Sequence, residues 1–476
     1  MNFDSDYTMT IGGVAVSASE IVPVLNPATE EVIAHAPSAN RDNLDAAVAA
    51  ARTAFASWSQ RPQSERQALV AAIGDKLEEY KEELMRLLTR EQGKPRAGAE
   101  WELTGAIIWC REIAKQELPI HIAEDSAERT VETRHVPIGV VGAITPWNYP
   151  ILLAIWKVLP ALLAGNTIIV KPSPYTPLAT LKIGEMMRDV LPAGVLNVVS
   201  GGNDLGQWMT NHPDIGKISF TGSTQTGKRI MESAAGTLKR ITLELGGNDA
   251  AIVLPDVDPK VVAKEIFWAA FQNSAQLCVA AKRLFVHTDI YDDLSHELVE
   301  YAKTVKLGDG SEQGVDLGPI QNKMQFEKVK GLLADARDKG LKFLLGGEVP
   351  DGKGYFVPVA IVDNPPDNSR VVVEEAFGPV LPLLKFSDLD EVVERANDTI
   401  YGLGGSVWSS DTTAARKVAE KLECGTVWIN EIHAFSPHAT FSGHKQSGIG
   451  VENAIQGLLE FTNAQTIVTK KLATAA

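Results

Sequence analysis

The 476-residue sequence contains only three cysteines, and its 45 basic residues are outnumbered by 60 acidic residues, giving a net charge of −15. The odd number and wide separation of Cys110, Cys278 and Cys424 disfavour a disulfide framework and favour a reducing compartment. The negative charge opposes the phosphate attraction on which nucleic-acid binding depends. Because no basic residue precedes Arg41, we expect neither a secretory signal nor a transit peptide, and we predict a cytoplasmic protein.

The sequence also lacks an uninterrupted apolar run long enough to cross a membrane. Its most apolar stretch, residues 149–170, is broken by Lys157, Pro160 and Asn166, whereas a span needs about 20 nearly uncharged residues. We therefore predict a buried helix and strand there, and no membrane partner. Apolar residues make up 45% of the chain and charged residues 22%, as in globular proteins. At about 150 residues per domain, the length suggests two or three domains.

The first 120 residues or so are predicted to be mostly helical. Ser64 and Gln67 match a capping box, which predicts a helix start at this point. Apolar residues then recur at a spacing that places them on one helix face: Leu69, Ile73, Leu77, Tyr80, Leu84 and Leu87. We expect this face to pack into a core, because the pattern covers too few heptads for a coiled coil.

From about residue 136, short β-rich runs alternate with helical runs. The predicted strands are 138–145, 167–171, 195–200, 217–221 and 240–245. The predicted helices are 151–163, 178–190, 205–209 and 224–235. Strand followed by helix, four times over, predicts an α/β fold with a doubly wound, Rossmann-like parallel sheet that binds its ligand at the carboxyl ends of the strands.

After Gly247 the alternation starts again, which predicts a second α/β domain. Its expected strands are 250–254, 283–287, 371–373, 405–408 and 426–429, and its expected helices are 259–273, 291–305 and 325–339. The tail 460–470 is β-branched and polar, and we predict that it forms an edge strand able to join a partner subunit.

A glycine-bearing turn follows the predicted strand 217–221. It contains Gly222, Gly227 and Lys228 in the spacing of a phosphate-binding loop, but Arg229 replaces the Ser or Thr that would hold Mg²⁺. The turn therefore fits the pyrophosphate of a dinucleotide better than a metal nucleotide. A strand-to-helix connection that binds nothing is an equally good interpretation of this motif alone.

Four polar residues follow predicted strands at one edge of the first sheet: Asn148, Lys171, Ser223 and Glu244. A lone carboxylate at the end of a central strand is costly unless it is paired or catalytic. The three cysteines, taken singly, fit small buried packing residues, and Cys278 is the one near a predicted helix end and strand start. His433, His438 and His444 lack metal-ligand spacing, so we predict no metal site, and no GxSxG motif indicates a serine hydrolase.

Together, these residues resemble the aldehyde dehydrogenase family along nearly the whole chain. Seven family motifs appear in order: Pro146–Asn148 (PWN), Lys171–Ser173 (KPS), Phe220–Ser223 (FTGS), Leu243–Gly247 (LELGG), Asn273–Cys278 (NSAQLC), Glu374–Val380 (EEAFGPV) and Lys445–Gly450 (KQSGIG). The resemblance implies that an aldehyde is oxidised to the carboxylic acid through a thiohemiacetal and a thioester on Cys278. It further implies that Asn148 and the Cys278 N–H bind the oxyanion and that Glu244 activates the hydrolytic water.

The resemblance also assigns cofactor and substrate contacts. NAD, with NADP possible, would be held by Trp147, Lys171, Ser173, Gly222, Ser223, Gly227, Leu245, Glu375 and Phe377. The substrate tunnel would comprise Tyr149, Trp156, Phe435 and Phe441, favouring an apolar aliphatic or aromatic aldehyde, although these can also be ordinary core aromatics. Pro174 stands where many NAD-preferring members carry a glutamate, so we predict NAD activity with appreciable NADP tolerance.

The family architecture predicts three parts. Residues 1–121 and 142–247 would form the NAD(P)-binding domain, residues 248–445 the catalytic domain, and residues 122–141 with 446–476 an oligomerisation element of a homodimer or homotetramer. Two departures are Ala275, where the family has glycine, and Asn248, where it has lysine. The extra methyl group of Ala275 could tighten the loop that carries the nucleophile.

Three other functions stay open at this point. A coenzyme A-acylating aldehyde dehydrogenase would not need Glu244 to activate water. A catalytically inert relative with a binding or structural role would not need Cys278, Glu244 and Asn148 together. A P-loop nucleotide hydrolase is disfavoured by Arg229.

Overall fold

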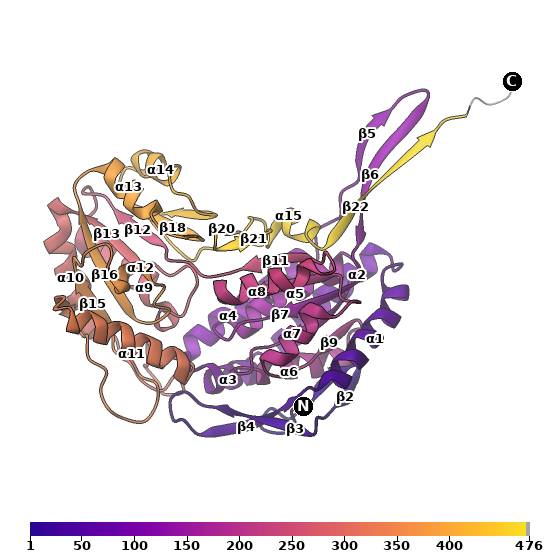
Figure 1. Cartoon of the computed structure of the whole chain (residues 1–476), viewed down its shortest axis with the longest axis horizontal. Coiled ribbons are helices and arrows are strands. Elements are labelled where there is room, and N and C mark those ends of the chain that lie inside the picture. Colours follow the sequence, from indigo (N-terminus) through magenta and orange to yellow (C-terminus); the bar gives the residue numbers. More distant parts are fainter. Residues whose placement is uncertain (473–476) are drawn as a thin grey trace.

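The computed structural model describes residues 1–472 as two α/β bodies and a projecting β arm (Figure 1). Residues up to about 247 form one body, together with a short return of the chain near the C-terminus. Residues from Ala250 to Ile429 build the sheet of the other. None of the helices within residues 1–472 is long and apolar enough to cross a membrane.

The first body is built on an eight-stranded sheet whose five central strands are parallel. Its order is β2(Val14–Val16), β1(Met9–Ile11), β9(Leu196–Val198), β8(Thr167–Lys171), β7(Val140–Ile144), β10(Lys217–Thr221), β11(Arg240–Glu244) and β21(Gly448–Ile449). The strands alternate with α5(Pro150–Leu163), α6(Leu178–Met186), the 3-10 turn η1(Met187–Asp189), α7(Asn203–Asn211) and α8(Thr224–Ala235). The predicted doubly wound parallel sheet is confirmed.

The N-terminal region is less helical than the sequence suggested. Besides β1 and β2, a separate antiparallel pair, β3(Glu20–Leu25) and β4(Val32–Ser38), precedes the helices. The helices are α1(Arg41–Trp58), α2(Gln63–Glu79), α3(Lys81–Gln92) and α4(Arg96–Ile113). The predicted apolar stripe is correct, since Ile73, Leu77, Leu84 and Leu87 are buried. The predicted capping box is wrong: α2 begins one residue earlier, so Ser64 lies within its first turn and makes no cap.

The second body contains a seven-stranded sheet. Its order is β14(Phe343–Leu345), β15(Ala360–Asp363), β16(Val380–Phe386), β13(Arg283–His287), β12(Ala250–Val253), β18(Gly404–Trp408) and β19(Thr426–Ile429), parallel except for β14. Its helical elements are α9(Pro259–Phe271), η2(Gln272–Ala275), η3(Thr288–Ile290), α10(Tyr291–Thr304), α11(Lys323–Asp338), α13(Leu389–Asn397) and α14(Thr412–Ala419). A short pair, β17(Tyr401–Gly402) and β20(His444–Lys445), lies antiparallel.

The strand predicted at residues 371–373 is wrong. These residues belong to a one-turn helix, α12(Arg370–Val373), in which Val371 and Val372 are buried and Val373 is exposed. Arg370 Nε lies 2.6 Å from Glu374 Oε1, an (i, i+4) ion pair that suits a helical turn. Packing against the second body therefore overrides the β preference of three valines in a row.

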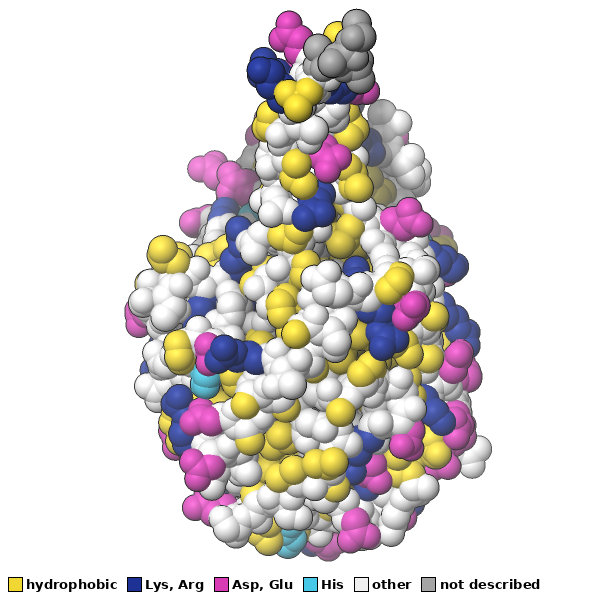
Figure 2. Space-filling view, turned by 90° about the vertical axis from the view of Figure 1, so that its right-hand side faces the viewer, with side chains coloured by type: hydrophobic (Ala, Val, Ile, Leu, Met, Phe, Trp, Pro, Cys, Tyr) yellow, Lys and Arg dark blue, Asp and Glu magenta, His cyan; other side chains and the backbone are white. Residues whose placement is uncertain are grey.

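The projecting arm is a three-stranded antiparallel sheet, β5(His121–Asp125), β6(Arg129–Pro137) and β22(Thr462–Lys470) (Figure 1). The β22 register runs from Thr462 opposite Pro137 to Lys470 opposite Arg129. Space-filling Figure 2 shows apolar side chains along its surface. Within the predicted oligomerisation segment 446–476, β21 instead pairs with β11 of the first body, α15(Ala454–Leu459) precedes β22, and residues 473–476 lie outside the described part of the chain.

Candidate active site

The carboxyl ends of the central parallel strands meet at one edge of the first sheet. In register, Lys171 at the end of β8 lies opposite Ile144 of β7, and Glu244 at the end of β11 lies opposite Thr221 of β10. Asn148 follows β7 by four residues, and Ser223 follows β10 and caps α8. The prediction that these four polar residues share one sheet edge is confirmed.

Cys278 lies in a loop from the second body that reaches this edge. The loop begins with three consecutive residues in the left-handed region, Asn273, Ser274 and Ala275, at φ 53°, 54° and 59°. Such a conformation costs a non-glycine residue about 1–2 kcal/mol, so Ala275 occupies a position suited to glycine. Side-chain bonds hold the loop in place: Ser274 Oγ donates to the Gly318 carbonyl at 2.6 Å, and the Gln276 side chain accepts from the Gln321 N–H at 2.8 Å.

A cavity of about 490 Å³ brings Cys278, Asn148 and Glu244 together. The aromatic residues predicted for the substrate, Tyr149, Trp156, Phe435 and Phe441, line it too. Sequence reasoning missed other lining residues: Trp101, Leu152, Leu153, Thr221, Leu277 and Glu452. The three groups predicted for chemistry and the four predicted for substrate binding therefore line one cavity.

The aromatic residues that line this cavity pack in two groups. Trp156 meets Phe435 and Phe441 edge-on, with ring centroids 5.8 and 5.7 Å apart, and the two phenylalanines are 5.7 Å from each other. Trp101 and Tyr149 form a further edge-on pair at 5.6 Å. Interlocked rings of this kind give a firm apolar surface suited to a flat or aliphatic molecule.

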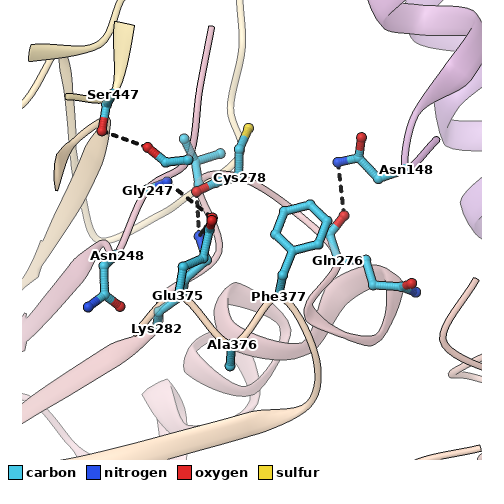
Figure 3. A network of polar contacts seen from close by, with 12 residues as sticks. Asn148, Gly247, Asn248, Gln276, Cys278, Lys282, Glu375, Ala376, Phe377 and Ser447 are labelled. Carbon is cyan, nitrogen blue, oxygen red and sulfur yellow. Dashed lines mark hydrogen bonds and ion pairs between the residues drawn. The ribbon is translucent and has the colours of Figure 1, made fainter. Parts of the chain in front are cut away.

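Asn148 is held by its backbone and its side chain. Its amide Nδ2 donates to the Gln276 carbonyl at 3.0 Å, as drawn in Figure 3, and its own carbonyl accepts from Lys94 Nζ at 2.8 Å. Lys94 is fully buried and pairs at 2.5 Å with Glu102, which accepts from two N–H groups at the start of α5. The amide is therefore fixed beside the loop that carries Cys278.

Glu244 is buried, and neither of its carboxyl oxygens has a hydrogen-bond partner among the described residues. Nearby, Lys157 Nζ pairs with Glu452 Oε1 at 2.5 Å, with both side chains almost fully buried. Burial raises the pKa of Glu244 well above its ordinary value, the Glu452 charge raises it further, and Lys157 opposes both. An unpaired buried carboxyl with a raised pKa, facing a cavity, is typical of a group that transfers protons.

The thiol pKa does not by itself distinguish Cys278. Burial raises the pKa of Cys278 and of Cys424 to about 12, and raises that of Cys110 as well. Cys110 is fully buried in the core, and Cys424 lines a different cavity of about 290 Å³. Only Cys278 faces Asn148 and Glu244, so location marks it out among three free cysteines.

Two glycines of the turn between β10 and α8 are packed closely against side chains of the same body. A Cβ on Gly222 would lie 2.5 Å from the Phe220 ring, and one on Gly227 would lie 2.6 Å from Leu245. Ser223 is exposed and its Oγ accepts from the Thr226 N–H at 3.2 Å, so the start of α8 faces outward. Free N–H groups at a helix N-terminus favour a pyrophosphate.

The other predicted cofactor residues lie around the same edge, and apart from Leu245 none lines the Cys278 cavity. Lys171 is 3% exposed, and among residues 1–472 its Nζ donates only to the Pro172 carbonyl, at 3.3 Å. Burial lowers the pKa of Lys171 to about 8. A buried ammonium with one long hydrogen bond can accept a further partner such as a ribose hydroxyl. Ser173, also buried, accepts from the Tyr175 N–H at 3.3 Å.

Glu375 and Phe377 reach the edge from the second body. Phe377 meets Trp147 edge-on at 5.3 Å. Glu375 Oε1 accepts from the Gly247 N–H at 3.1 Å and lies 3.6 Å from Lys282 Nζ (Figure 3). These contacts fit a dinucleotide that extends from the α8 N-terminus toward Cys278.

The three histidines singled out from the sequence lie in different surroundings. His433 is buried under the Cys278 loop, where Nε2 lies 3.3 Å from the Val279 carbonyl, whereas His438 and His444 are exposed. Within residues 1–472, no group of three or more His, Cys, Asp or Glu residues is arranged to hold a metal ion.

Comparisons with known proteins agree with this geometry. The model of the aldehyde dehydrogenase family matches residues 14–467. A probable aldehyde dehydrogenase of Pseudomonas sp. is 44% identical over 481 residues, covering 99% of this chain and 96% of the relative. Phenylacetaldehyde dehydrogenase of Pseudomonas fluorescens is 37% identical over 480 residues, covering 97% and 95%.

Solved structures match equally well. An aldehyde dehydrogenase of Bacillus cereus in complex with NAD⁺ superposes with a TM-score of 0.95 at 38% identity, covering 98% of this chain and 97% of that chain. A betaine aldehyde dehydrogenase of Staphylococcus aureus, also with NAD⁺, gives 0.95 at 34% identity and covers 99% and 96%. With the family model spanning nearly its full length, this chain belongs to the aldehyde dehydrogenase family.

Proposed function

We propose that Cys278 is the nucleophile with which this protein oxidises an aldehyde to a carboxylic acid. The observation that carries the proposal is the convergence of Cys278, Asn148 and Glu244 on one cavity with apolar walls. The Cys278 thiol gives up its proton to water, its sulfur bonds to the aldehyde carbon as the carbonyl π bond breaks, and the carbonyl oxygen becomes an alkoxide. The chemistry that NAD⁺ supplies when bound is acceptance of a hydride, which leaves a thioester on Cys278.

Asn148 is assigned the role of stabilising the alkoxide. Its side-chain amide lies in the same cavity as Cys278, and it is held there by Gln276 and by the buried Lys94. A prearranged donor acts most strongly where water is excluded, because it needs no reorganisation when negative charge develops. The Cys278 N–H is the second donor in this assignment.

Glu244 is assigned the activation of water in the second half of the reaction. Its ionised carboxylate takes a proton from water, the resulting hydroxide attacks the thioester carbon, and the carbon–sulfur bond breaks to release the acid and the thiolate. Both oxygens of Glu244 lack partners in the described structure, so they are available for this work. A protein that transferred the acyl group to coenzyme A would not need this buried carboxyl.

The cofactor is assigned to the edge that carries the β10–α8 turn. Gly222, Ser223 and Gly227 would receive the pyrophosphate, and Leu245 would pack beneath it. Lys171 and Ser173 would contact the adenine-side ribose, Glu375 the nicotinamide-side ribose, and Trp147 with Phe377 would line the cofactor. The exposed start of α8 at Ser223 and the buried ammonium of Lys171, with its one long hydrogen bond among the described residues, support this placement. NADP use stays part of the proposal.

The substrate is proposed to be an apolar aliphatic or aromatic aldehyde. Tyr149, Trp156, Phe435 and Phe441 present rings to the cavity, and the leucines beside them add no charge. Phenylacetaldehyde dehydrogenase, one of the relatives, is named for an aldehyde of this kind.

We also propose a homodimer or homotetramer assembled through the arm. Its outer strands β22 and β5 each have β6 as their one neighbour in the described sheet. Val468 on β22 is 62% exposed, Ile122 on β5 is 49% exposed, and Ile120 just before β5 is 64% exposed. Exposed apolar side chains on edge strands favour pairing with another chain. The domain limits predicted from the sequence belong to the same proposal, as does a cytoplasmic location, which the three free cysteines support.

The decisive experiment follows NADH absorbance with short-chain, medium-chain, long-chain and aromatic aldehydes. Wild type is compared with Cys278→Ala and with Cys424→Ala, a matched control because Cys424 is half-buried outside the cavity. We expect turnover without coenzyme A that is lost only in Cys278→Ala. Normal turnover in that variant would refute the mechanism, coenzyme A dependence would support the acylating alternative, and no turnover with any aldehyde would support an inert relative.

A further inference from the structure

Lys282 lies beneath the loop that carries Cys278, and the proposed mechanism leaves it unused. Its side chain is 5% exposed, and its Nζ donates to the main-chain carbonyl of Cys278 itself. The same Nζ lies 3.6 Å from Glu375 Oε1. Figure 3 shows Lys282 and Glu375 side by side below Cys278. One buried ammonium therefore contacts both the nucleophile's backbone and the carboxylate assigned to the cofactor.

The Glu375 carboxylate is confined on its other sides. Its Oε1 accepts from the Gly247 N–H at 3.1 Å, and a Cβ on Gly246 would lie only 2.6 Å from Oε2. Three segments that are far apart in the sequence thus meet at this group: the end of β11, the Cys278 loop and the chain before β16. Lys282 is the positively charged member of the junction, so it sets how the Cys278 loop lies against Glu375.

Several acidic residues lie near Lys282 and Cys278. Asp249 is buried, its two oxygens have no hydrogen-bond partner among the described residues, and burial raises its pKa to about 7. The negative charges of Asp249, Glu244 and Glu375 all raise the pKa of Cys278, and Lys282 lowers it. Burial lowers the pKa of His433 to about 3, so this histidine is neutral near pH 7.

Two other cations of this region bond to backbone oxygens. Lys328 Nζ donates to the Glu375 carbonyl at 2.7 Å. The Arg283 guanidinium donates to the carbonyls of Asn248, Arg395 and Ala396, at 2.8, 3.1 and 2.7 Å. Its charge is therefore directed to three backbone oxygens of the second body, and Lys282 is left as the cation bonded to Cys278.

We propose that Lys282 is a positioning residue that ties the Cys278 main chain to Glu375 and supplies the positive charge that favours the Cys278 thiolate. This inference rests on the proposed function, because it assigns Lys282 its effect through Cys278 and Glu375. A lysine that merely satisfied backbone carbonyls would have no such effect. Lys239 is an example of that kind: it is buried and donates to the carbonyls of His212 and Ile215.

The test measures the pH dependence of Cys278 alkylation by iodoacetamide in protein without cofactor, read by peptide mass. Lys282→Gln keeps a hydrogen-bond donor and removes the charge. A neighbouring charge shifts a pKa by about 1–3 units, so we expect the alkylation profile to move to higher pH by that amount. At a pH below the pKa of Cys278, each rise of one unit in that pKa lowers the thiolate fraction about tenfold. We therefore expect the alkylation rate at pH 8 to fall by the same factor.

A second readout is the dissociation constant of NAD⁺, measured by protein fluorescence. We expect weaker NAD⁺ binding in Lys282→Gln, because Glu375 loses its ion-pair partner, and recovery of most of both effects in Lys282→Arg. Lys239→Gln is the matched control and should leave both readouts unchanged. If Lys282→Gln alkylates with the wild-type pH profile and binds NAD⁺ with wild-type affinity, the proposal is wrong.

The two readouts of this test are independent of the proposed function. Alkylation and NAD⁺ binding need no turnover, so they report on Lys282 whether or not Cys278 reacts with aldehydes. Should Lys282→Gln fail to fold, Lys282→Arg supplies the answer: a wild-type profile supports the charge, and a profile shifted to higher pH overturns it, since Arg retains the charge.

Discussion

Replacing Asn148 by alanine separates catalysis from stability. The substitution removes one oxyanion donor, a change that typically lowers kcat by about 10²–10³, or about 2.7–4 kcal/mol of transition-state stabilisation. In the folded protein it removes one amide-to-carbonyl bond, of 3.0 Å, to Gln276. That bond contributes about 0.5–1.5 kcal/mol to stability.

The folded state should tolerate this loss. The Gln276 carbonyl keeps a second donor, Asn273 Nδ2 at 3.4 Å, and the Asn148 backbone remains held by Lys94. In a chain of this size a loss of about 1 kcal/mol lowers the melting temperature by about 2–4 °C or less. We therefore expect Asn148→Ala to melt close to wild type and to lose about 10²–10³ in kcat.

Asn248 offers a matched control for this experiment. Like Asn148 it is buried, and its Nδ2 donates to one main-chain carbonyl, that of Val372, at 2.7 Å. In Figure 3 its side chain points away from Cys278. Steady-state NADH formation and thermal melting are measured on both variants. Equal losses of kcat in Asn148→Ala and Asn248→Ala, or a loss below tenfold in the former, would refute the oxyanion assignment.

Three further predictions concern the proton-transferring groups and the cofactor. Glu244→Gln should still form the thioester but hydrolyse it about 10²–10⁴-fold more slowly, so quenched samples should contain acylated Cys278 by mass; unmodified Cys278 during turnover would contradict this. Because the Glu452 charge raises the pKa of Glu244, Glu452→Gln should shift the pH profile of hydrolysis to lower pH, and a shift to higher pH would count against the assignment. Burial lowers the pKa of Lys171 to about 8, so the ratio of kcat/KM for NADP⁺ over NAD⁺ should fall as pH rises through about 8, where the ammonium that attracts the 2′-phosphate is lost; a constant ratio or no NADP⁺ turnover would reject this role.

The sequence was most informative where short elements are bounded by turn residues. The predicted strands 167–171 and 217–221 and the helix 224–235 match the structure to the residue, because glycine, proline or serine flanks them and their apolar pattern is unambiguous. The four N-terminal strands were missed. Several of their residues are exposed, and β1 joins the first sheet through a single pairing, Thr10 with Val198, which no local pattern reveals.

The shared sheet edge was predictable, but the charges behind it were not. Parallel topology places the ends of neighbouring strands together, so the proximity of Glu244 and Asn148 follows from the order of elements. The pair Lys157–Glu452 joins residues 295 positions apart, and Lys157 lies inside the most apolar helix of the chain. From the sequence alone, Lys157 only interrupts an apolar run, because its partner Glu452 is not known. Lys282 likewise gives no signal, because a lysine just before a strand is common at the protein surface.

Cys278 and Glu244 share one cavity, so the ionisation of one affects the other. Burial disfavours the charged form of both groups and raises both pKa values. An ionised Glu244 raises the pKa of Cys278, so the thiolate forms more readily while Glu244 is protonated. We infer that the negative charges of the Cys278 thiolate and of an ionised Glu244 oppose each other in one cavity, so that nucleophilic attack is favoured while Glu244 is protonated and water activation needs its ionised form.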